Sequence, residues 1–302
     1  MSSPDVDALD LRLLDALRHD GRATFEALAR EVGLSRPATR DRLQRLLSGG
    51  VVQVTGVVHP SVFGLTAYAH TAVQVEGPAL PVARCIATFP DVPFVTVASG
   101  RFAVIAEVRT TDHTSLAATL RRIAALPDVR ALSTAVYTEI LTDAHFPPQP
   151  YTAVPVDEFD RRLLAELRND GRAAFADLGA SVGLSTSAAR TRVLRLLESG
   201  AVHVGARVNT NALGLAQLTG FQLGLGHAAD EAVAAIRDLP QVQYLATAVG
   251  RADVIGSVVT YAAEETLRVL DEVRAVAGVR DLESWTHLSV VKEQYDTPLD
   301  PA

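Results

Sequence analysis

The chain has 302 residues, of which 48% are hydrophobic and 21% charged, which excludes a disordered protein and allows two or more compact domains. The formal net charge of −7 excludes a general polycation, although it is compatible with local basic surfaces that bind nucleic acid. A single cysteine, a polar start without a signal peptide and the lack of any long apolar run predict a cytoplasmic protein.

The chain repeats itself after 150 residues. Residues 10–52 and 160–202 align without a gap and are identical at 24 of 43 positions. Later landmarks stay in the same register, among them "ASGRFAVI" (98–105) and "AVGRADVI" (248–255). Such a repeat predicts a duplicated gene and two modules of the same fold.

Within each half the hydrophobic period changes from helical to strand-like. Residues 9–50 have apolar side chains at helical spacing, and Gly21 and Gly33 interrupt the pattern, which predicts three helices. After residue 51 we predict a strand, a helix, two strands, a helix and a strand, over residues 66–77, 79–89, 92–99, 102–109, 113–126 and 129–141. The order β-α-β-β-α-β is ferredoxin-like, and the second half repeats it over roughly residues 216–292.

The fold class is therefore α+β, with two tandem modules that each join a three-helix domain to a βαββαβ domain. Four prolines in "DAHFPPQPYTAVPVDEF" (143–159) predict an extended linker between the modules. We expect a first helical domain at 1–55, a first α+β domain at 56–142, the linker at 143–156, a second helical domain at 157–205, a second α+β domain at 206–295 and a tail at 296–302.

The second and third helices of each helical domain have the pattern of a winged-type helix-turn-helix. Gly33 permits a tight turn, Ser35 is a good N-cap, and Pro37 loses no hydrogen bond in a first helical turn. Residues 35–47 contain four arginines and one aspartate, and residues 185–197 contain three arginines and no acid, which gives each segment a net charge of +3. The rest of the chain then carries −13, since −7 − 6 = −13.

This concentration of charge predicts two recognition helices that enter the major groove of DNA. The candidate DNA-binding residues are Ser35, Arg36, Pro37, Arg40, Arg42, Ser185, Thr186, Ser187, Arg190 and Arg192. Of these, Arg36, Arg40, Thr186 and Arg190 are expected to face the groove. Arg42 and Arg192, farther round the helix, either hold phosphate or brace the fold. The alternative is that arginines on an exposed helix face are simply solvated.

The pattern "D..LL.ALR.DGR..F..LA..VGLS" resembles the Lrp/AsnC family of transcription regulators. That family pairs an N-terminal helix-turn-helix with a C-terminal βαββαβ ligand-responsive domain. This chain resembles two such subunits joined head to tail, a built-in pseudo-dimer. The resemblance implies a sequence-specific, DNA-binding transcription regulator of the nucleoid, whose partners are double-stranded DNA, a small-molecule effector and further copies of the chain in a homo-oligomer.

In that family a Gly-x-aromatic-Asp loop between the second and third strands lies near a site usually filled by an amino acid. Here each loop keeps half of the signature: the first has an aromatic residue without the acid, and the second has the acid without the aromatic residue. The candidate ligand-binding residues are Gly100, Arg101, Phe102, Gly250, Arg251 and Asp253. Arg251 could bind the carboxylate of an amino acid and Asp253 its ammonium group. Alternatively, each glycine only makes a hairpin turn beside a solvated arginine.

No catalytic chemistry is evident from the eight histidines. None occupies the same position in both repeats, none has metal-ligand spacing, and no Gly-x-Ser-x-Gly motif is present. We therefore predict no enzyme activity, no catalytic residue, no metal site and no cofactor. The alternative is a sirohaem decarboxylase-like enzyme, because fused two-module chains of similar architecture include those enzymes.

Overall fold

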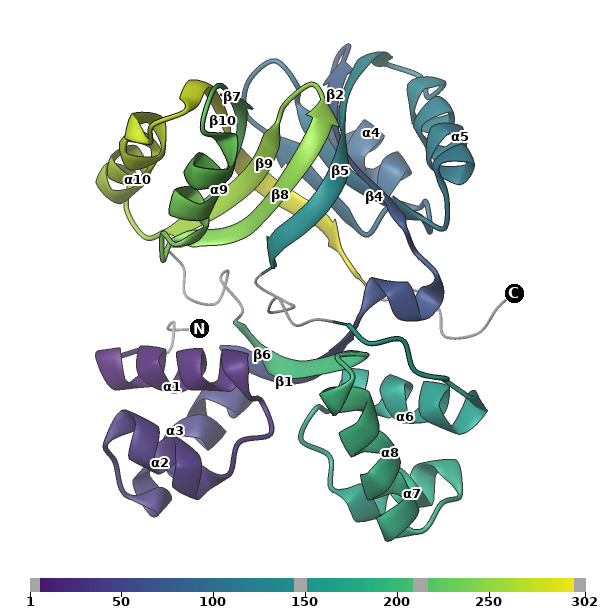
Figure 1. The fold of residues 1–302 in the computed structure, drawn as a ribbon, viewed down its shortest axis with the longest axis vertical. Helices are drawn as coiled ribbons and strands as arrows, with labels where there is room; N and C mark the ends of the chain where they lie inside the picture. Colours follow the sequence, from purple (N-terminus) through teal and green to yellow (C-terminus); the bar gives the residue numbers. More distant parts are fainter. Residues whose placement is uncertain (1–5, 144–150, 209–216, 296–302) are drawn as a thin grey trace. The chain divides into compact units, whose positions relative to one another are not determined.

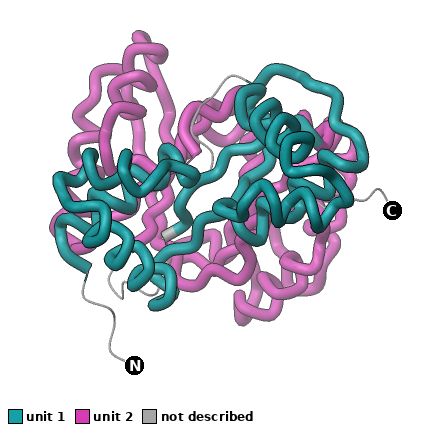
Figure 2. The backbone as a smooth tube through the Cα atoms, turned by 90° about the horizontal axis from the view of Figure 1, so that it is seen from below, with its two compact units in different colours: residues 1–62, 145–215, 298–302 teal, residues 63–144, 216–297 magenta. Residues whose placement is uncertain are grey.

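The computed structural model describes residues 6–143, 151–208 and 217–295, and it divides the chain into two compact units. The head unit comprises residues 1–62, 145–215 and 298–302, and the barrel unit comprises residues 63–144 and 216–297 (Figure 2). Each unit therefore takes chain from both halves of the sequence. The boundaries fall after residues 62 and 215, later than the expected 55 and 205, because the strand that follows each third helix stays with the heads.

The predicted helices of both heads are confirmed (Figure 1). They are α1 (Ala8–His19), α2 (Phe25–Val32) and α3 (Arg36–Ser48) in the first head, and α6 (Glu158–Asn169), α7 (Phe175–Val182) and α8 (Thr186–Glu198) in the second. In the first head, side chains of Asp7, Thr24 and Ser35 accept hydrogen bonds from backbone N–H groups and so cap the three helices. The second helix ends at Gly33, whose φ of +73° is a left-handed conformation that favours glycine.

Each third helix is followed by a strand that pairs with its counterpart from the other half. Strands β1 (Val52–Val58) and β6 (Val202–Val208) are antiparallel, with Val52 opposite Val208 and Val58 opposite Val202. A short 3-10 helix (Pro60–Phe63) follows β1. The two-stranded sheet therefore joins the two heads, a pairing that the helical periodicity of either half does not reveal.

Arg22 and Arg172 make reciprocal contacts across this junction, which we call the arginine clasp. Arg22 donates to the carbonyl oxygens of Gly171 (2.6 Å) and Ala173 (2.9 Å), and its guanidinium lies 4.8 Å from the ring centre of Phe175. Arg172 donates in the same way to Gly21 (2.5 Å) and Ala23 (3.0 Å). Each head thus supplies a cation that satisfies backbone carbonyls of the other head.

The barrel unit contains both βαββαβ repeats, as predicted. The first is β2 (Ala67–Val75), α4 (Ala79–Ala87), β3 (Phe94–Ala98), β4 (Val104–Thr110), α5 (His113–Ala124) and β5 (Val129–Asp143). The second is β7 (Gln217–Leu225), α9 (Ala229–Arg237), β8 (Val242–Gly250), β9 (Val254–Thr260), α10 (Ala263–Ala275) and β10 (Val279–Glu293). The first helix of the first repeat ends two residues earlier than expected, and the following strand starts two residues later.

The eight strands form one closed barrel in the order β10-β3-β4-β2-β5-β8-β9-β7. The long strands close it, because β5 pairs with β8 of the second repeat and β10 pairs with β3 of the first. Helices α4 and α5 cover the outer face of one repeat, and α9 and α10 cover the other (Figure 1). Closure leaves no unpaired sheet edge between the repeats.

No helix within residues 6–143, 151–208 and 217–295 is long and apolar enough to span a lipid bilayer.

The clasp generates a stability prediction. Replacing Arg22 by Ala removes two hydrogen bonds from a charged donor, and we expect the unfolding free energy of the head unit to fall by about 2–4 kcal/mol. Arg22→Lys should recover only part of this loss, because an ammonium group lacks the planar fork that bridges two carbonyls. Chemical denaturation followed by circular dichroism measures both effects. As a control, Arg36→Ala removes an exposed arginine from the same head, and an equal loss in that variant would contradict the clasp.

Candidate nucleic-acid interface and barrel site

The face of α3 that carries Arg36 and Arg40, both expected to face the groove, is exposed. Its residues are Arg36, Pro37, Arg40, Asp41 and Gln44, whereas Thr39, Leu43 and Leu46 are buried in the head. Ser35 is exposed at the helix N-terminus, and its hydroxyl accepts a hydrogen bond from the N–H of Ala38 at 3.3 Å. The guanidinium of Arg40 lies 3.4 Å from Asp41, with both side chains largely in solvent. The pair is therefore weak, and Arg40 can be redirected to another anion.

The corresponding face of α8 is exposed over its first turns. Thr186, Ser187, Arg190 and Thr191 are exposed, and Ser185 caps the helix by accepting from the N–H of Ala188. Leu194, farther along the same face, is half-buried. The two faces therefore agree in the placement of Arg40 and Arg190 and differ around them.

Two other arginines of α3 contact a buried carboxylate of the first helix. Arg42 donates to Asp7 at 2.6 Å and to Asp10 at 2.9 Å, and Arg45 donates to the second oxygen of Asp10 at 2.5 Å. The side chain of Asp10 has no exposed surface. A carboxylate can be buried this way because both oxygens receive charged donors, and the N–H of Asp7 donates to it as well.

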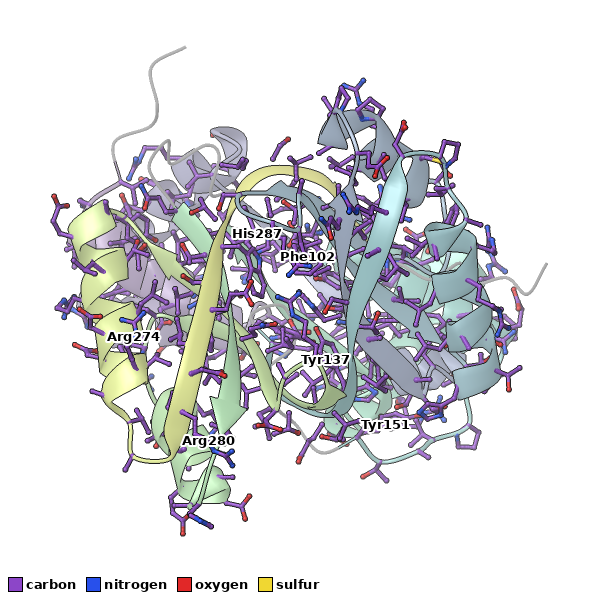
Figure 3. All side chains as sticks on the ribbon, turned by 90° about the horizontal axis from the view of Figure 1, so that it is seen from above. Phe102, Tyr137, Tyr151, Arg274, Arg280 and His287 are labelled. Carbon is purple, nitrogen blue, oxygen red and sulfur yellow. The ribbon has the colours of Figure 1, made fainter. Side chains whose placement is uncertain are left out.

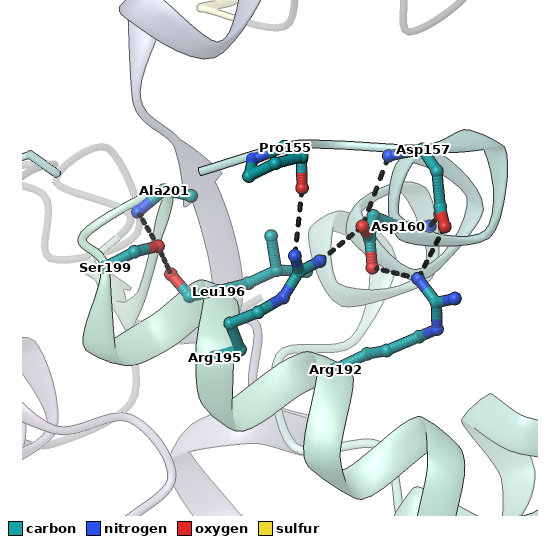
Figure 4. Close-up of polar contacts among 8 residues, drawn as sticks. All are labelled: Pro155, Asp157, Asp160, Arg192, Arg195, Leu196, Ser199 and Ala201. Carbon is teal, nitrogen blue, oxygen red and sulfur yellow. Dashed lines mark hydrogen bonds and ion pairs between the residues drawn. The ribbon is translucent and has the colours of Figure 1, made fainter. Parts of the chain in front are cut away.

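The second head repeats this arrangement around Asp160 (Figure 4). Arg192 donates to Asp157 at 2.8 Å and to Asp160 at 2.9 Å, and Arg195 contacts the other oxygen of Asp160. Asp160 is 1% exposed. These contacts favour the second of the two expected roles for Arg42 and Arg192, the bracing of the fold. They also mean that much of the +3 charge on each third helix is compensated by the first helix.

Several residues of this interface were not singled out from the sequence. Asp10 and Asp160 hold the third helix against the first, and Arg22 and Arg172 hold the heads together. The signal was present in the repeat, because each of these residues has an identical counterpart 150 positions away.

The two glycine-arginine loops lie in the barrel unit as hairpin turns. Gly100 and Gly250 have φ values of +94° and +113°, which other residues rarely adopt. Arg101 is exposed, whereas the side chain of Arg251 is only 10% exposed. The guanidinium of Arg251 lies 4.4 Å from the ring centre of Phe102, so the structure brings together one residue from each loop.

Arg251 and Asp253 have different partners. Arg251 donates to Glu283 at 2.9 Å, and Asp253 accepts a hydrogen bond from the N–H of Leu225 at 2.7 Å. Their contacts therefore do not support the expectation that Arg251 and Asp253 bind opposite ends of one amino acid. Glu283 is the acid that accompanies Arg251, and it was not expected.

Next to Arg251 and Phe102, the barrel interior holds His70, Trp285 and His287, and we call these five residues the Arg251 cluster. The rings of His70 and Trp285 are 5.3 Å apart, and Trp285 donates to Nε2 of His287 at 3.1 Å. Figure 3 shows Phe102 and His287 near the middle of the barrel, in contrast to Arg274 on the outer helix α10. Burial, with the charges of Arg251 and His287, lowers the pKa of His70 to about 3, so its ring is neutral at pH 7.

A second polar group lies elsewhere in the barrel. Glu107 and Arg109 form an ion pair on β4, and both side chains are 7% exposed. Arg109 also lies 3.8 Å from Asp143. Burial raises the pKa of Glu107, an effect that the charge of Arg109 opposes, and burial also raises the pKa of the neighbouring Tyr244. No group of three or more metal-ligating side chains occurs among the residues that the structure describes.

The buried carboxylate of the first head leads to a second stability prediction. Asp10→Ala leaves Arg42 and Arg45 without their shared partner. Because both guanidiniums are partly exposed to solvent, we expect the free energy of unfolding to fall by about 2–3 kcal/mol. Calorimetry of the full chain measures the change in the head unit. Asp41→Ala is the matched control, since it removes an exposed acid from the same head. Equal stability of the two variants would refute the bracing role of Asp10.

Comparison with known proteins places these features in a family. The AsnC-type helix-turn-helix domain matches residues 6–47 and again residues 156–197. A C-terminal dimeric alpha+beta barrel domain of AsnC-type regulators matches residues 69–146. The two helix-turn-helix matches correspond to the two heads, and the barrel match begins in β2.

Similar proteins span one half of the chain at a time. An HTH-type transcriptional regulator of Mycobacterium tuberculosis is 36% identical over 137 residues, which cover 44% of this chain and 93% of the relative. A proline dehydrogenase transcriptional activator of Rhizobium radiobacter is 30% identical over 138 residues, which cover 44% of this chain and 88% of the activator. Each relative therefore has the length of a single repeat.

Among solved structures, the siroheme decarboxylase NirDL in complex with an iron-uroporphyrin III analogue superposes with a TM-score of 0.67. The match covers 95% of both chains at 15% identity, so it shows a shared fold. With two matching helix-turn-helix domains and a close single-module relative, the chain belongs to the Lrp/AsnC family of helix-turn-helix transcription regulators, with two complete modules fused in one chain.

Proposed function

We propose that the protein is a sequence-specific DNA-binding transcription regulator that presents two recognition helices from one chain. The observation that supports this most is the pair of exposed faces on α3 and α8, which carry Arg40 and Arg190 at matching positions. Strand pairing and the arginine clasp join the two heads within one unit. A joined pair of helix-turn-helix domains has the organisation that binds two DNA half-sites.

Each candidate residue has a role in this proposal. Arg36, Arg40, Thr186 and Arg190 face the groove, where arginine binds guanine edges or phosphate and threonine makes short contacts. Ser35, Ser185 and Ser187 lie at the helix N-termini, where hydroxyls and exposed backbone N–H groups bind phosphate. Pro37, which has no N–H, fixes the backbone of the first turn of α3. Arg42 and Arg192 act indirectly, because they fix the angle between the third and first helices.

We further propose that the barrel unit binds a small-molecule effector and sets the assembly state of the chain in a homo-oligomer. Arg251 and Phe102, one from each loop, are the candidate residues that contact each other. Gly100 and Gly250 permit the turns that carry them, whereas Asp253 stabilises the backbone beside β7. Arg101 is exposed and contributes less to a site inside the barrel.

The second candidate function is a sirohaem decarboxylase-like enzyme, and two observations favour it. The fold of NirDL covers nearly the whole chain, and inside the barrel His70 is buried and His287 is half-buried. An enzyme of this kind has no need of exposed arginines on both third helices, so the regulator remains the better-supported function. Titration with sirohaem distinguishes the two: a shifted absorption band and decarboxylation would support the enzyme.

The placement of the recognition helices predicts the effect of removing their arginines. Arg40→Ala or Arg190→Ala should each weaken binding to the selected DNA site by about 1–3 kcal/mol if the side chain contacts a base. Fluorescence anisotropy with labelled duplex DNA measures the affinity, and circular dichroism verifies the fold. Arg84→Ala, an exposed arginine on α4, is the control. Unchanged affinity and footprint in the double variant would show that these helices do not read DNA.

The two faces also predict unequal half-sites. Identical heads prefer palindromes, but these heads differ at every outward position except Arg40 and Arg190. Selection from a random DNA pool should therefore recover half-sites that share the bases opposite these arginines and differ on the flanks.

A variant with equal faces provides the control for that selection. It carries the four substitutions Thr186→Arg, Ser187→Pro, Thr191→Asp and Leu194→Gln, which give α8 the outward residues of α3. Its selected sites should become palindromic. If the unaltered protein already selects a perfect palindrome with both halves equally constrained, the heads are equivalent and the prediction is wrong.

A further inference from the structure

The Arg251 cluster contains buried polar atoms that no described residue satisfies. Both ring nitrogens of His70, Nη1 of Arg251 and Nδ1 of His287 lack a hydrogen-bond partner among the residues that the structure describes. His70 itself is 5% exposed. Native proteins pair nearly all such atoms, because a buried donor or acceptor without a partner is destabilising. Four unpaired polar atoms within one cluster of side chains could serve as donors and acceptors for a ligand.

The cluster occurs only once, although the barrel is built from a repeat. The positions equivalent to Arg251, Phe102, His70, Trp285 and His287 hold Arg101, Ala252, Gly220, Ala135 and Tyr137. Across the strands, the large His70 is opposite Ala135 and the large Trp285 is opposite Gly220. A Cβ atom on Gly220 would lie 2.2 Å from the Trp285 ring. The two copies have thus diverged in a complementary way: one site holds Phe102, His70 and Trp285, and the other has Ala252, Gly220 and Ala135 at the equivalent positions.

The chemistry of the cluster selects among ligands. Arg251 Nη1 is a charged donor suited to a carboxylate oxygen. His70, neutral at pH 7, offers one N–H donor and one acceptor nitrogen. Trp285 and Phe102 pack with Ala72, Ala98 and Ile105, so the apolar part of the cluster is aromatic and suits a planar body.

The same surroundings disfavour an ammonium group. Glu283 is the carboxylate beside Arg251, and its Oε2 already accepts from both Arg251 and Gln222. Asp253 is bonded to the backbone of Leu225. Gln222 Oε1 is a further buried acceptor without a described partner, but a neutral oxygen suits a hydroxyl or amide donor. A cation placed beside the Arg251 guanidinium would be repelled by it, and the charge of Glu283 is already paired with that guanidinium.

We infer that the Arg251 cluster binds one small aromatic carboxylate without an ammonium group per chain. This inference rests on the proposed effector-binding role of the barrel and narrows its ligand from amino acids in general to aryl-alkanoic acids. The carboxylate binds Nη1 of Arg251 and the N–H of His70, and the ring lies against Trp285 and Phe102. The equivalent site in the other half of the barrel stays empty, since it has Ala252, Gly220 and Ala135 in place of Phe102, His70 and Trp285.

The test compares 3-phenylpropanoate with L-phenylalanine, which differ only by the α-ammonium group, on the full chain without DNA. Trp285 is the only tryptophan, so its emission reports the site directly, and isothermal titration gives the stoichiometry. We expect 3-phenylpropanoate to bind at one site per chain and to change the Trp285 emission. L-phenylalanine should bind about tenfold or more weakly.

Matched variants locate the site. Arg251→Gln should weaken binding about tenfold or more, whereas Arg101→Gln, the equivalent change in the other loop, should leave it unchanged. If Arg251→Gln does not fold, His70→Gln provides the same comparison. Equal binding of the two acids, equal effects of the two arginine variants, two sites per chain, or no binding at millimolar concentration would each overturn the inference.

These outcomes are separable from those of the proposed function. Failure of ligand binding in a protein that binds its selected DNA site would remove only the effector inference. Failure of DNA binding in a protein that binds 3-phenylpropanoate would instead remove the proposed DNA-binding function.

Discussion

Backbone pairing between the two halves of the chain is the constraint on which the rest of the structure depends. The hydrogen-bonding edges of β1, β5 and β10 are satisfied by β6, β8 and β3 of the other repeat. Neither half could form its complete sheets alone, because an unpaired edge would expose backbone donors and acceptors. Fusion of the repeats makes this pairing intramolecular, so it needs no second chain and does not depend on protein concentration.

The same pairing governs the spacing of the proposed DNA-binding surfaces. Joining β1 to β6 places the end of the first helix of one head beside the strand of the other, where Gly21 donates to the carbonyl of Val204. A side chain at that position would meet this carbonyl at 2.8 Å, so the close approach requires glycine. The arginine clasp then adds charged hydrogen bonds on both sides. The two heads, and with them the proposed recognition helices, are therefore joined within a single chain.

Duplication within one chain also permits asymmetry that a homodimer cannot have. Every residue of a homodimer site occurs twice. Here the contact between His70 and Trp285 occurs once, because the equivalent positions hold Gly220 and Ala135. The buried braces at Asp10 and Asp160 remain identical, while the outward helix faces and the barrel interior differ. The braces have thus stayed equal, whereas the outward helix positions other than Arg40 and Arg190, and most positions of the Arg251 cluster, have diverged.

The sequence by itself determined the local structure: helical and strand periodicities, helix caps and glycine turns located the helices and most strands, and the repeat revealed two modules. It also located the exposed arginines at 36, 40 and 190 from helical spacing. Only the tertiary structure decided which charges are neutralised, because Arg42 and Asp10 are 32 residues apart and meet only through packing. The barrel site likewise depends on tertiary structure. His70, Phe102, Arg251 and Trp285 lie on separate strands and turns, and strand order, a property of the whole sheet, brings them together.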